Sequence, residues 1–202
     1  TEKEKAFLAR KEFNPYLYRA WLMMADAQFR KGEFFEAAST YNYIIRLYAT
    51  QPEVVCVARA RLARCYVALE WPYDAEDLLG KMRRDSITRQ GTREHDNTMA
   101  AYLVLTNQYA EAIPYLERTI KNTRGTLPRA RLHCLHGQLN QQVGRNEEAY
   151  RAYSRVVNAH PPYEMAFNAR IAQTEVMPRD KFNQMITRLK RMARRDKNKD
   201  YL

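Results

Sequence analysis

The chain has 202 residues and a net charge of +11, from 34 Lys and Arg against 23 Asp and Glu. Hydrophobic residues make up 46% and charged residues 28%, which excludes wholesale disorder, and no run of 18 apolar residues predicts a membrane-spanning helix. The 6 Gly and 8 Pro are too few for the many tight turns of a β-sandwich or barrel, so the composition favours an all-α fold.

The first predicted elements are helical. Residues 1–13 are interpreted as the last helix of a preceding repeat or a partial repeat. A helix hairpin is then predicted over 14–51. Its first helix contains Trp21, Met24 and Ala25, and its second reads Gly32-x-Phe34-x-x-Ala37-x-x-x-Tyr41-x-x-Ile44.

The same pattern recurs, and further units are predicted near 52–92, 93–126, 127–160 and 161–196. The small residue of the second helix recurs at Ala37, Ala75, Ala112 and Ala149, with spacings of 38, 37 and 37. Loops are expected at 83–86 and 122–125, where the apolar periodicity lapses. Because the chain begins with Thr1 and stops inside a repeat pattern, we expect an array cut from a longer protein.

This pattern resembles the tetratricopeptide repeat (TPR), whose core period is about 34 residues. Small residues on the first helices (Ala25, Ala63, Ala100 and Gly137) allow close helix approach, and large ones such as Tyr41 and Tyr153 fill the gap to the next hairpin. One hairpin cannot bury its own apolar stripe, so neighbours must stack. The sequence therefore predicts an all-α, right-handed α-solenoid of about five TPR-like hairpins.

Cysteine and histidine are interpreted as packing residues, and no cofactor or metal is predicted. Cys56 and Cys65 share one predicted helix about 13 Å apart, too far for a disulfide, and Cys134 makes the count odd. His133-Cys134-x-His136 is the most metal-like cluster, but it lacks a second ligand pair at zinc-site spacing. Packing of His136 in a repeat helix is the favoured interpretation.

No catalytic set is predicted, so the sequence does not favour an enzyme. Glu94-His95-Asp96 is interpreted as the acidic N-terminus of a helix rather than an acid/base pair. The three serines, Ser39, Ser86 and Ser154, lie outside any Gly-x-Ser-x-Gly motif, and no phosphate-binding glycine loop is present.

The candidate partner-binding site is the concave groove, formed by exposed positions of the first helices. The expected groove residues are Arg19, Leu22, Asp26, Phe29, Arg61, Arg64, Asn97, Arg131, Gln138 and Gln141. The Lys/Asn/Arg carboxylate clamp of chaperone-binding TPR proteins is not present, since Leu22 and Asp26 occupy two of its positions. A mixed, mildly basic groove suits a peptide or another folded protein, or it merely faces solvent; no small-molecule substrate is predicted.

The C-terminal segment 179–200 carries nine Lys and Arg against three Asp, or +6. This charge suits nucleic acid or acidic headgroups. The apolar stripe of Phe182, Met185, Ile186, Leu189 and Met192 instead favours an amphipathic packed helix with a basic outer face.

Several longer strings carry a more specific resemblance. Among them are Gln51-Pro52-Glu53-Val54-Val55 and the stretches 14–21, 44–48, 63–66, 73–77, 109–117, 158–164, 167–171 and 191–202. Together they are similar to the SprE/PorW-type TPR lipoproteins of Bacteroidetes gliding motility and type IX secretion. That resemblance implies a non-enzymatic scaffold at the periplasmic face of the outer membrane, held by an anchor outside this chain, that couples the secretion ring to the translocon.

A cytosolic peptide-binding adaptor with the same fold is the alternative, and nucleic-acid binding through the basic segment is a third. The sequence upstream of Thr1 distinguishes the first two, since a lipoprotein signal would support the envelope scaffold.

Overall fold

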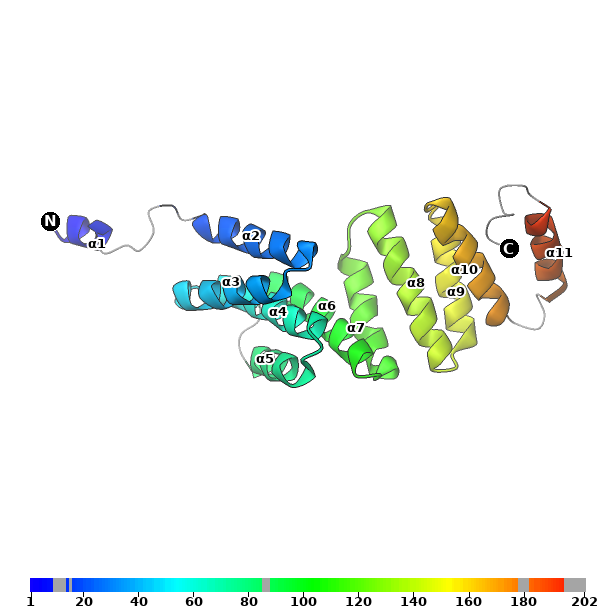
Figure 1. Cartoon of the computed structure of the whole chain (residues 1–202), viewed down its shortest axis with the longest axis horizontal. Helices are drawn as coiled ribbons and strands as arrows, with labels where there is room; N and C mark the ends of the chain where they lie inside the picture. The colour runs from blue at the N-terminus through cyan, green and yellow to red at the C-terminus, as the bar shows by residue number, and fades with distance from the viewer. Residues whose placement is uncertain (9–13, 15, 85–87, 178–181, 195–202) are drawn as a thin grey trace. The chain divides into compact units, whose positions relative to one another are not determined.

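The computed structural model describes residues 1–8, 14, 16–84, 88–177 and 182–194, and every regular element within them is an α-helix (Figure 1). This confirms the all-α prediction. The helices are α1 (Glu2–Leu8), α2 (Leu17–Lys31), α3 (Phe34–Leu47), α4 (Pro52–Ala68), α5 (Pro72–Arg84), α6 (Arg89–Leu105), α7 (Tyr109–Asn122), α8 (Thr126–Gln142), α9 (Asn146–Asn158), α10 (Tyr163–Glu175) and α11 (Phe182–Ala193). None of these helices is long and apolar enough to cross a membrane.

The chain divides into two compact units, residues 1–107 and 108–202. In unit 1, α2 packs on α3, α3 on α4, and α4 on both α5 and α6. In unit 2, α7 packs on α8, α8 on α9, and α9 on α10 (Figure 1). Each unit is thus built of consecutive helix hairpins, as in an α-solenoid. The five predicted repeat boundaries stay predictions.

The hairpin turns share one backbone conformation. α2 ends at Gly32, whose φ of 86° lies in the left-handed region, and the next amide, of Glu33, donates to the carbonyl of Gln28. Glu70, Asn107 and Gly144 occupy equivalent positions, also with positive φ. Two of these four turns therefore form without glycine, which is why the glycine signal was absent from the second and third units.

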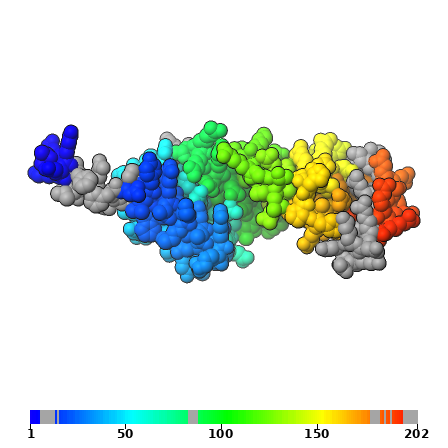
Figure 2. Space-filling view, turned by 90° about the horizontal axis from the view of Figure 1, so that it is seen from above, coloured from blue at the N-terminus to red at the C-terminus, as the bar shows by residue number. Residues whose placement is uncertain are grey.

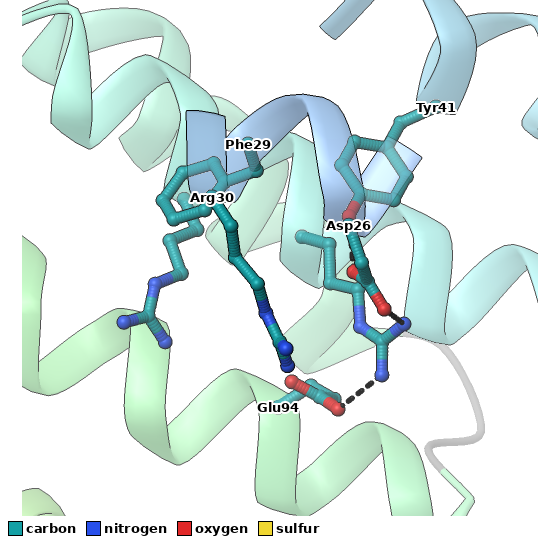
Figure 3. A pocket seen from close by; sticks show the side chains of 7 residues that line it. Asp26, Phe29, Arg30, Tyr41 and Glu94 are labelled. Carbon is teal, nitrogen blue, oxygen red and sulfur yellow. Dashed lines mark hydrogen bonds and ion pairs between the residues drawn. The ribbon is translucent and has the colours of Figure 1, made fainter. Parts of the chain in front are cut away.

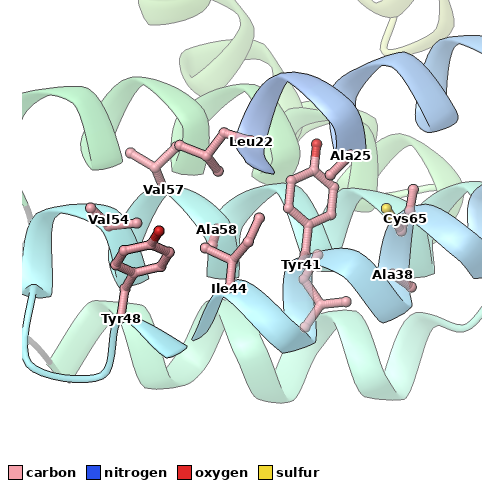
Figure 4. Close-up of a cluster of buried hydrophobic side chains, with 12 residues drawn as sticks. Leu22, Ala25, Ala38, Tyr41, Ile44, Tyr48, Val54, Val57, Ala58 and Cys65 are labelled. Carbon is pink, nitrogen blue, oxygen red and sulfur yellow. The ribbon is translucent and has the colours of Figure 1, made fainter. Parts of the chain in front are cut away.

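The core of unit 1 follows the predicted large-and-small pattern (Figure 4). Ala25 of α2 and Ala37 of α3 are fully buried, and the Tyr41 side chain, 1% exposed, packs between them and α4. Residues of α4, including Val57, Ala58 and Cys65, belong to the same cluster. Burial of such side chains provides the main stabilisation of the unit, at about 1.5–3 kcal/mol for each large one.

In unit 2, α8 and α9 pack closely at Gly137. A Cβ atom built on Gly137 of α8 would lie 2.5 Å from Cε1 of Tyr153 on α9. The aromatic ring therefore occupies the volume that any side chain at 137 would need. This confirms the predicted role of Gly137 in helix packing.

One local prediction was wrong. α6 begins at Arg89, after the N-cap Thr88, whose hydroxyl accepts from the Gly91 amide. Glu94, His95 and Asp96 therefore lie in the second turn rather than at the helix start. His95 and Asp96 are buried and contribute to packing, whereas Glu94 is half-buried.

The basic C-terminal segment is described only in part. α11 contains all five residues of the predicted apolar stripe, and Met192 is buried. Arg179, Lys181, Arg195, Lys197 and Lys199 lie outside the described residues. The balance between packing and nucleic-acid binding in this segment stays a prediction.

Candidate partner-binding surface

The exposed face of α2 in unit 1 borders two adjacent hollows. Arg19, Leu22, Asp26 and Phe29 recur at spacings of three and four, so they lie along one side of the helix. The first hollow, of about 300 Å³, is lined by Asp26, Phe29, Arg30, Tyr41, Arg61, Arg64 and Glu94 (Figure 3). The second, of about 400 Å³, is lined by Tyr18, Arg19, Leu22, Met23, Asp26, Glu53, Val54, Val57, Arg61 and Gln90.

A hydrogen-bonded chain of four side chains lies where the two hollows meet. Arg61 of α4 donates from Nη1 to Asp26 Oδ2 at 2.8 Å and from Nη2 to Glu94 Oε1 at 2.7 Å (Figure 3). Tyr41 of α3 donates its hydroxyl to Asp26 Oδ1 at 2.5 Å. The chain joins α2, α3, α4 and α6. It engages both carboxylate oxygens of Asp26 and one of Glu94.

Burial and charge together determine the ionisation of this chain. Burial by itself lowers the pKa of Arg61. The hydrogen bond to Glu94 and the negative charges of Glu94 and Asp26 raise it by more, so the pKa of Arg61 is raised overall. Burial raises the pKa of Tyr41, and the hydrogen bond to Asp26 raises it further. Arg61 is therefore cationic and Tyr41 neutral across the physiological range.

The first hollow has an excess of positive charge. Besides Arg61, it is lined by Arg30 and Arg64, for which the described residues supply no carboxylate partner. The Arg64 guanidinium lies 5.6 Å from the ring centroid of Phe29, which in turn packs against Phe34 at 5.1 Å. Of the three guanidinium groups that line this hollow, only that of Arg61 is paired with its carboxylates.

The second hollow is more apolar. Leu22, Val54 and Val57 are buried at its floor, while Met23 is 70% exposed at its edge. Arg19 lies over the ring of Tyr16, 5.0 Å from its centroid. An apolar floor with a charged edge suits a hydrophobic side chain flanked by backbone.

The structure brings together six of the ten predicted groove residues. Arg19, Leu22, Asp26, Phe29, Arg61 and Arg64 all line one or both hollows. Asn97 of α6 is half-buried and lines neither. Arg131, Gln138 and Gln141 belong to α8 in unit 2, where Gln141 accepts from the Tyr153 hydroxyl at 3.0 Å and donates to Glu175 at 2.9 Å. A binding role for these ten residues stays a prediction.

Sequence reasoning missed several lining residues. Tyr41 was assigned to packing alone, although its hydroxyl reaches the charged chain. The sequence predicts a helix start at Glu94 and gives no site signal for Arg30. The repeat pattern gives no signal for Glu94, because its pairing with Arg61 joins two residues 33 positions apart in the sequence.

The histidine and cysteine cluster of unit 2 is part of the packing. His136 is buried, with Nε2 3.3 Å from Glu117 Oε1 and 3.2 Å from Asn140 Nδ2. Burial lowers the pKa of His136 despite the opposing charge of Glu117, so the ring is neutral at pH 7. No group of three or more His, Cys, Asp or Glu among the described side chains is placed to hold a metal ion.

A smaller hollow of about 290 Å³ lies beside this cluster. It is lined by Gly125, Thr126, Arg129, Ala130, His133, Arg155 and Ala159. Burial, followed by the charge of Arg155, lowers the pKa of His133.

Consecutive helix hairpins with small residues at their contacts are the architecture of tetratricopeptide repeats. A family model described as a tetratricopeptide repeat matches residues 19–50, which span most of α2 and all of α3. A search of curated protein sequences gave no match.

Solved TPR structures share the fold. Kinesin light chain TPR-like repeats of Podosopora anserina align with a TM-score of 0.64 and 17% identity, covering 89% of this chain and 96% of theirs. YrrB, described as a TPR protein with an unusual peptide-binding site, aligns with a TM-score of 0.57 and 20% identity. The alignment covers 83% of this chain and 81% of YrrB. MamA aligns with a TM-score of 0.53 and 18% identity, over 85% of this chain and 97% of MamA. At these identities the likeness shows the fold alone.

Proposed function

We propose that the protein is a non-enzymatic scaffold that binds a segment of another protein across the two hollows of unit 1. The observation that carries the proposal is the adjacency of a basic hollow and an apolar hollow on one helix face, joined through Asp26 and Arg61. The TPR fold supports a protein partner, and the peptide-binding site in the description of YrrB supports a segment as its form.

The size and chemistry of the hollows define the segment. The hollows, of about 300 and 400 Å³, lie at the lower end of the range of about 300–1,000 Å³ for small-molecule sites, and each can hold a few side chains of a bound segment. Arg30 and Arg64 favour a carboxylate in the first hollow, and Leu22, Val54 and Val57 favour an apolar side chain in the second. The preferred ligand is therefore an extended segment with an acidic residue and an apolar residue close together.

We place this scaffold in the type IX secretion and gliding machinery, at the periplasmic face of the outer membrane. Sequence resemblance to the SprE/PorW-type lipoproteins supports this setting, and the secretion ring and translocon supply its expected partners. The alternative setting is a cytosolic peptide-binding adaptor, which would use the same two hollows.

Two neighbouring methionines provide a matched test. Met23 and Met24 are both exposed on α2, but only Met23 lines a hollow. In a cross-linking pull-down from the native host, we expect Met23→Asp to lose the captured partner and Met24→Asp to retain it. Equal capture by both variants would refute binding at the hollows.

The same experiment tests the setting. Capture of secretion-ring or translocon components from the envelope fraction supports the envelope scaffold. Capture of cytosolic proteins alone, still sensitive to Met23→Asp, would refute the setting while leaving the binding surface intact.

A further inference from the structure

Unit 1 carries a second surface whose chemistry is opposite to that of the first hollow. Residues 33–36 and 70–77, hereafter the aromatic patch, contain four aromatic residues, six Asp or Glu and no Lys or Arg. The whole chain, by contrast, has a net charge of +11. The two segments are 33 residues apart, so only the fold brings them together.

The aromatic side chains form one exposed cluster. Phe35, in the first turn of α3, packs on Trp71, just before α5, with ring centroids 5.6 Å apart. Trp71 also contacts Tyr66 at 5.8 Å. Phe35 is 60% exposed, Trp71 42% and Tyr73, two residues later, 84%. These are among the most exposed large apolar side chains described.

The hairpin fold does not require these aromatics. Phe35 and Tyr73 occupy equivalent repeat positions 38 residues apart, and the next two equivalents are Ala110 and Glu147. Both of those are exposed, in helices that pack in the same way. Large exposed apolar side chains at this position are therefore specific to the first two hairpins. Clustered exposed apolar surface of this kind marks an interaction site.

The charges around the cluster indicate what it binds. Within the patch, Glu33 pairs with Lys31 and Asp77 with Lys81. The carboxylates of Glu36, Glu70 and Asp74 have no ion pair or hydrogen bond to any described residue. Acidic residues in the first turn of a helix stabilise its dipole, which accounts for Glu36 and Asp74 but not for the aromatics beside them.

We propose that the aromatic patch binds a lysine- or arginine-rich segment of another protein. Cations lie favourably over aromatic faces, and guanidinium groups pair with carboxylates. Phe35, Trp71 and Tyr73 provide the faces, and Glu36, Glu70 and Asp74 the counter-charges. The proposal does not depend on the hollows, because the patch shares no residue with either of them.

The test is a peptide titration of the full chain. The probe is an acetylated, amidated decapeptide with six arginines and four glycines, and its matched control replaces every arginine with neutral citrulline. Trp71 fluorescence in a Trp21→Phe background reports binding. We expect the arginine peptide to bind with an affinity that falls as salt rises, and the citrulline peptide to bind at least tenfold more weakly.

Two sets of variants assign the site. Glu36→Gln/Glu70→Gln/Asp74→Asn removes three charges from the patch, and Glu111→Gln/Glu147→Gln/Glu148→Gln removes three from the exposed first turns of α7 and α9. We expect the first triple variant to lose tenfold or more in affinity and the second less than twofold. Tyr73→Ala, at a side chain almost fully in solvent, should lose about threefold, as expected for an exposed cation–π contact.

Three results would overturn the proposal. Equal binding of the citrulline peptide would show that charge is not recognised. Equal losses in the two triple variants would show general electrostatic attraction. Concentration-dependent dimerisation abolished by Tyr73→Ala, without arginine-peptide binding, would identify a second copy of the chain as the occupant.

Discussion

The close contact between Gly137 and Tyr153 predicts that Gly137→Ala destabilises the protein, although helix propensity alone would favour alanine. Replacing a glycine in a helix interior with alanine ordinarily stabilises the helix by about 1 kcal/mol. At Gly137 the added Cβ would lie 2.5 Å from Cε1, 2.8 Å from Cδ1 and 2.8 Å from Cζ of Tyr153. Such contacts are too short for carbon atoms, so the ring or the α8–α9 packing must shift.

The two terms can be compared. Overpacking a well-packed core costs about 1–3 kcal/mol, which exceeds or cancels the gain in helix propensity. The shift also disturbs the hydrogen bond from Tyr153 to Gln141. We therefore expect Gly137→Ala to destabilise the protein by about 0–2 kcal/mol.

Gly80 of α5 is the matched control. A Cβ at Gly80 meets nothing within 4 Å, so Gly80→Ala should stabilise the protein by about 0.5–1 kcal/mol. The two substitutions are chemically identical and differ only in the space around them. Their effects should differ by about 1–3 kcal/mol.

Urea denaturation followed by circular dichroism measures both effects, and hydrogen exchange of α8 and α9 amides locates the change in unit 2. Tyr153→Leu removes the ring, so adding Gly137→Ala in that background should no longer destabilise. Stabilisation by Gly137→Ala as large as that by Gly80→Ala would refute the packing argument.

Three further predictions follow from the polar groups of the two cores. Burial raises the pKa of Cys65 to about 12, so its thiol is neutral and enclosed. It should therefore resist Ellman's reagent at pH 8 until urea unfolds the chain. Rapid labelling of Cys65 in the native protein, located by mass spectrometry, would contradict this. Burial lowers the pKa of His136, which lies near Glu117 and Arg155. As the pH drops, the imidazole is therefore protonated in the unfolded chain before it is protonated in the folded one. The free energy of unfolding should then fall below about pH 6.5. His136→Leu should weaken that dependence in urea midpoints measured from pH 7.5 to 5, and an unchanged slope would exclude His136 as its source. Arg61→Met leaves Asp26 and Glu94 without their cation and should lower the free energy of unfolding by about 1–3 kcal/mol. Adding Glu94→Gln to this variant should recover part of the loss. An unchanged free energy of unfolding in Arg61→Met would show that the charged chain is not stabilising.

The repeat pattern was sufficient to predict the fold and its packing residues. The small residues from Ala37 to Ala149 were predicted from spacing alone, and all are fully buried. Spacing succeeds here because each hairpin repeats the same neighbour contact, so one geometric constraint recurs along the sequence.

The candidate site was only partly predictable, because its contacts join non-equivalent positions. The groove positions of α2 could be inferred from helical periodicity, but the pairing of Arg61 with Glu94 depends on the register of two helices. The start of α6 was misplaced for a related reason: its N-cap, Thr88, lies close to residues with no clear periodicity. The aromatic patch likewise required the fold to bring Phe35 and Trp71 together.

The position of Arg61 also affects how unit 1 unfolds. In a simple solenoid each hairpin contacts only its neighbours, so a terminal hairpin can unravel at the cost of one interface. Arg61 bonds both to Asp26 of α2 and to Glu94 of α6, which lie on either side of its own hairpin. Fraying of α2 would remove Asp26, so Arg61 and Tyr41 would each lose a hydrogen bond, while Arg61 would stay paired with Glu94. We expect α2 to α6 to open as a single cooperative block, so that a partner bound at the two hollows would also stabilise the parts of α6 that it does not contact.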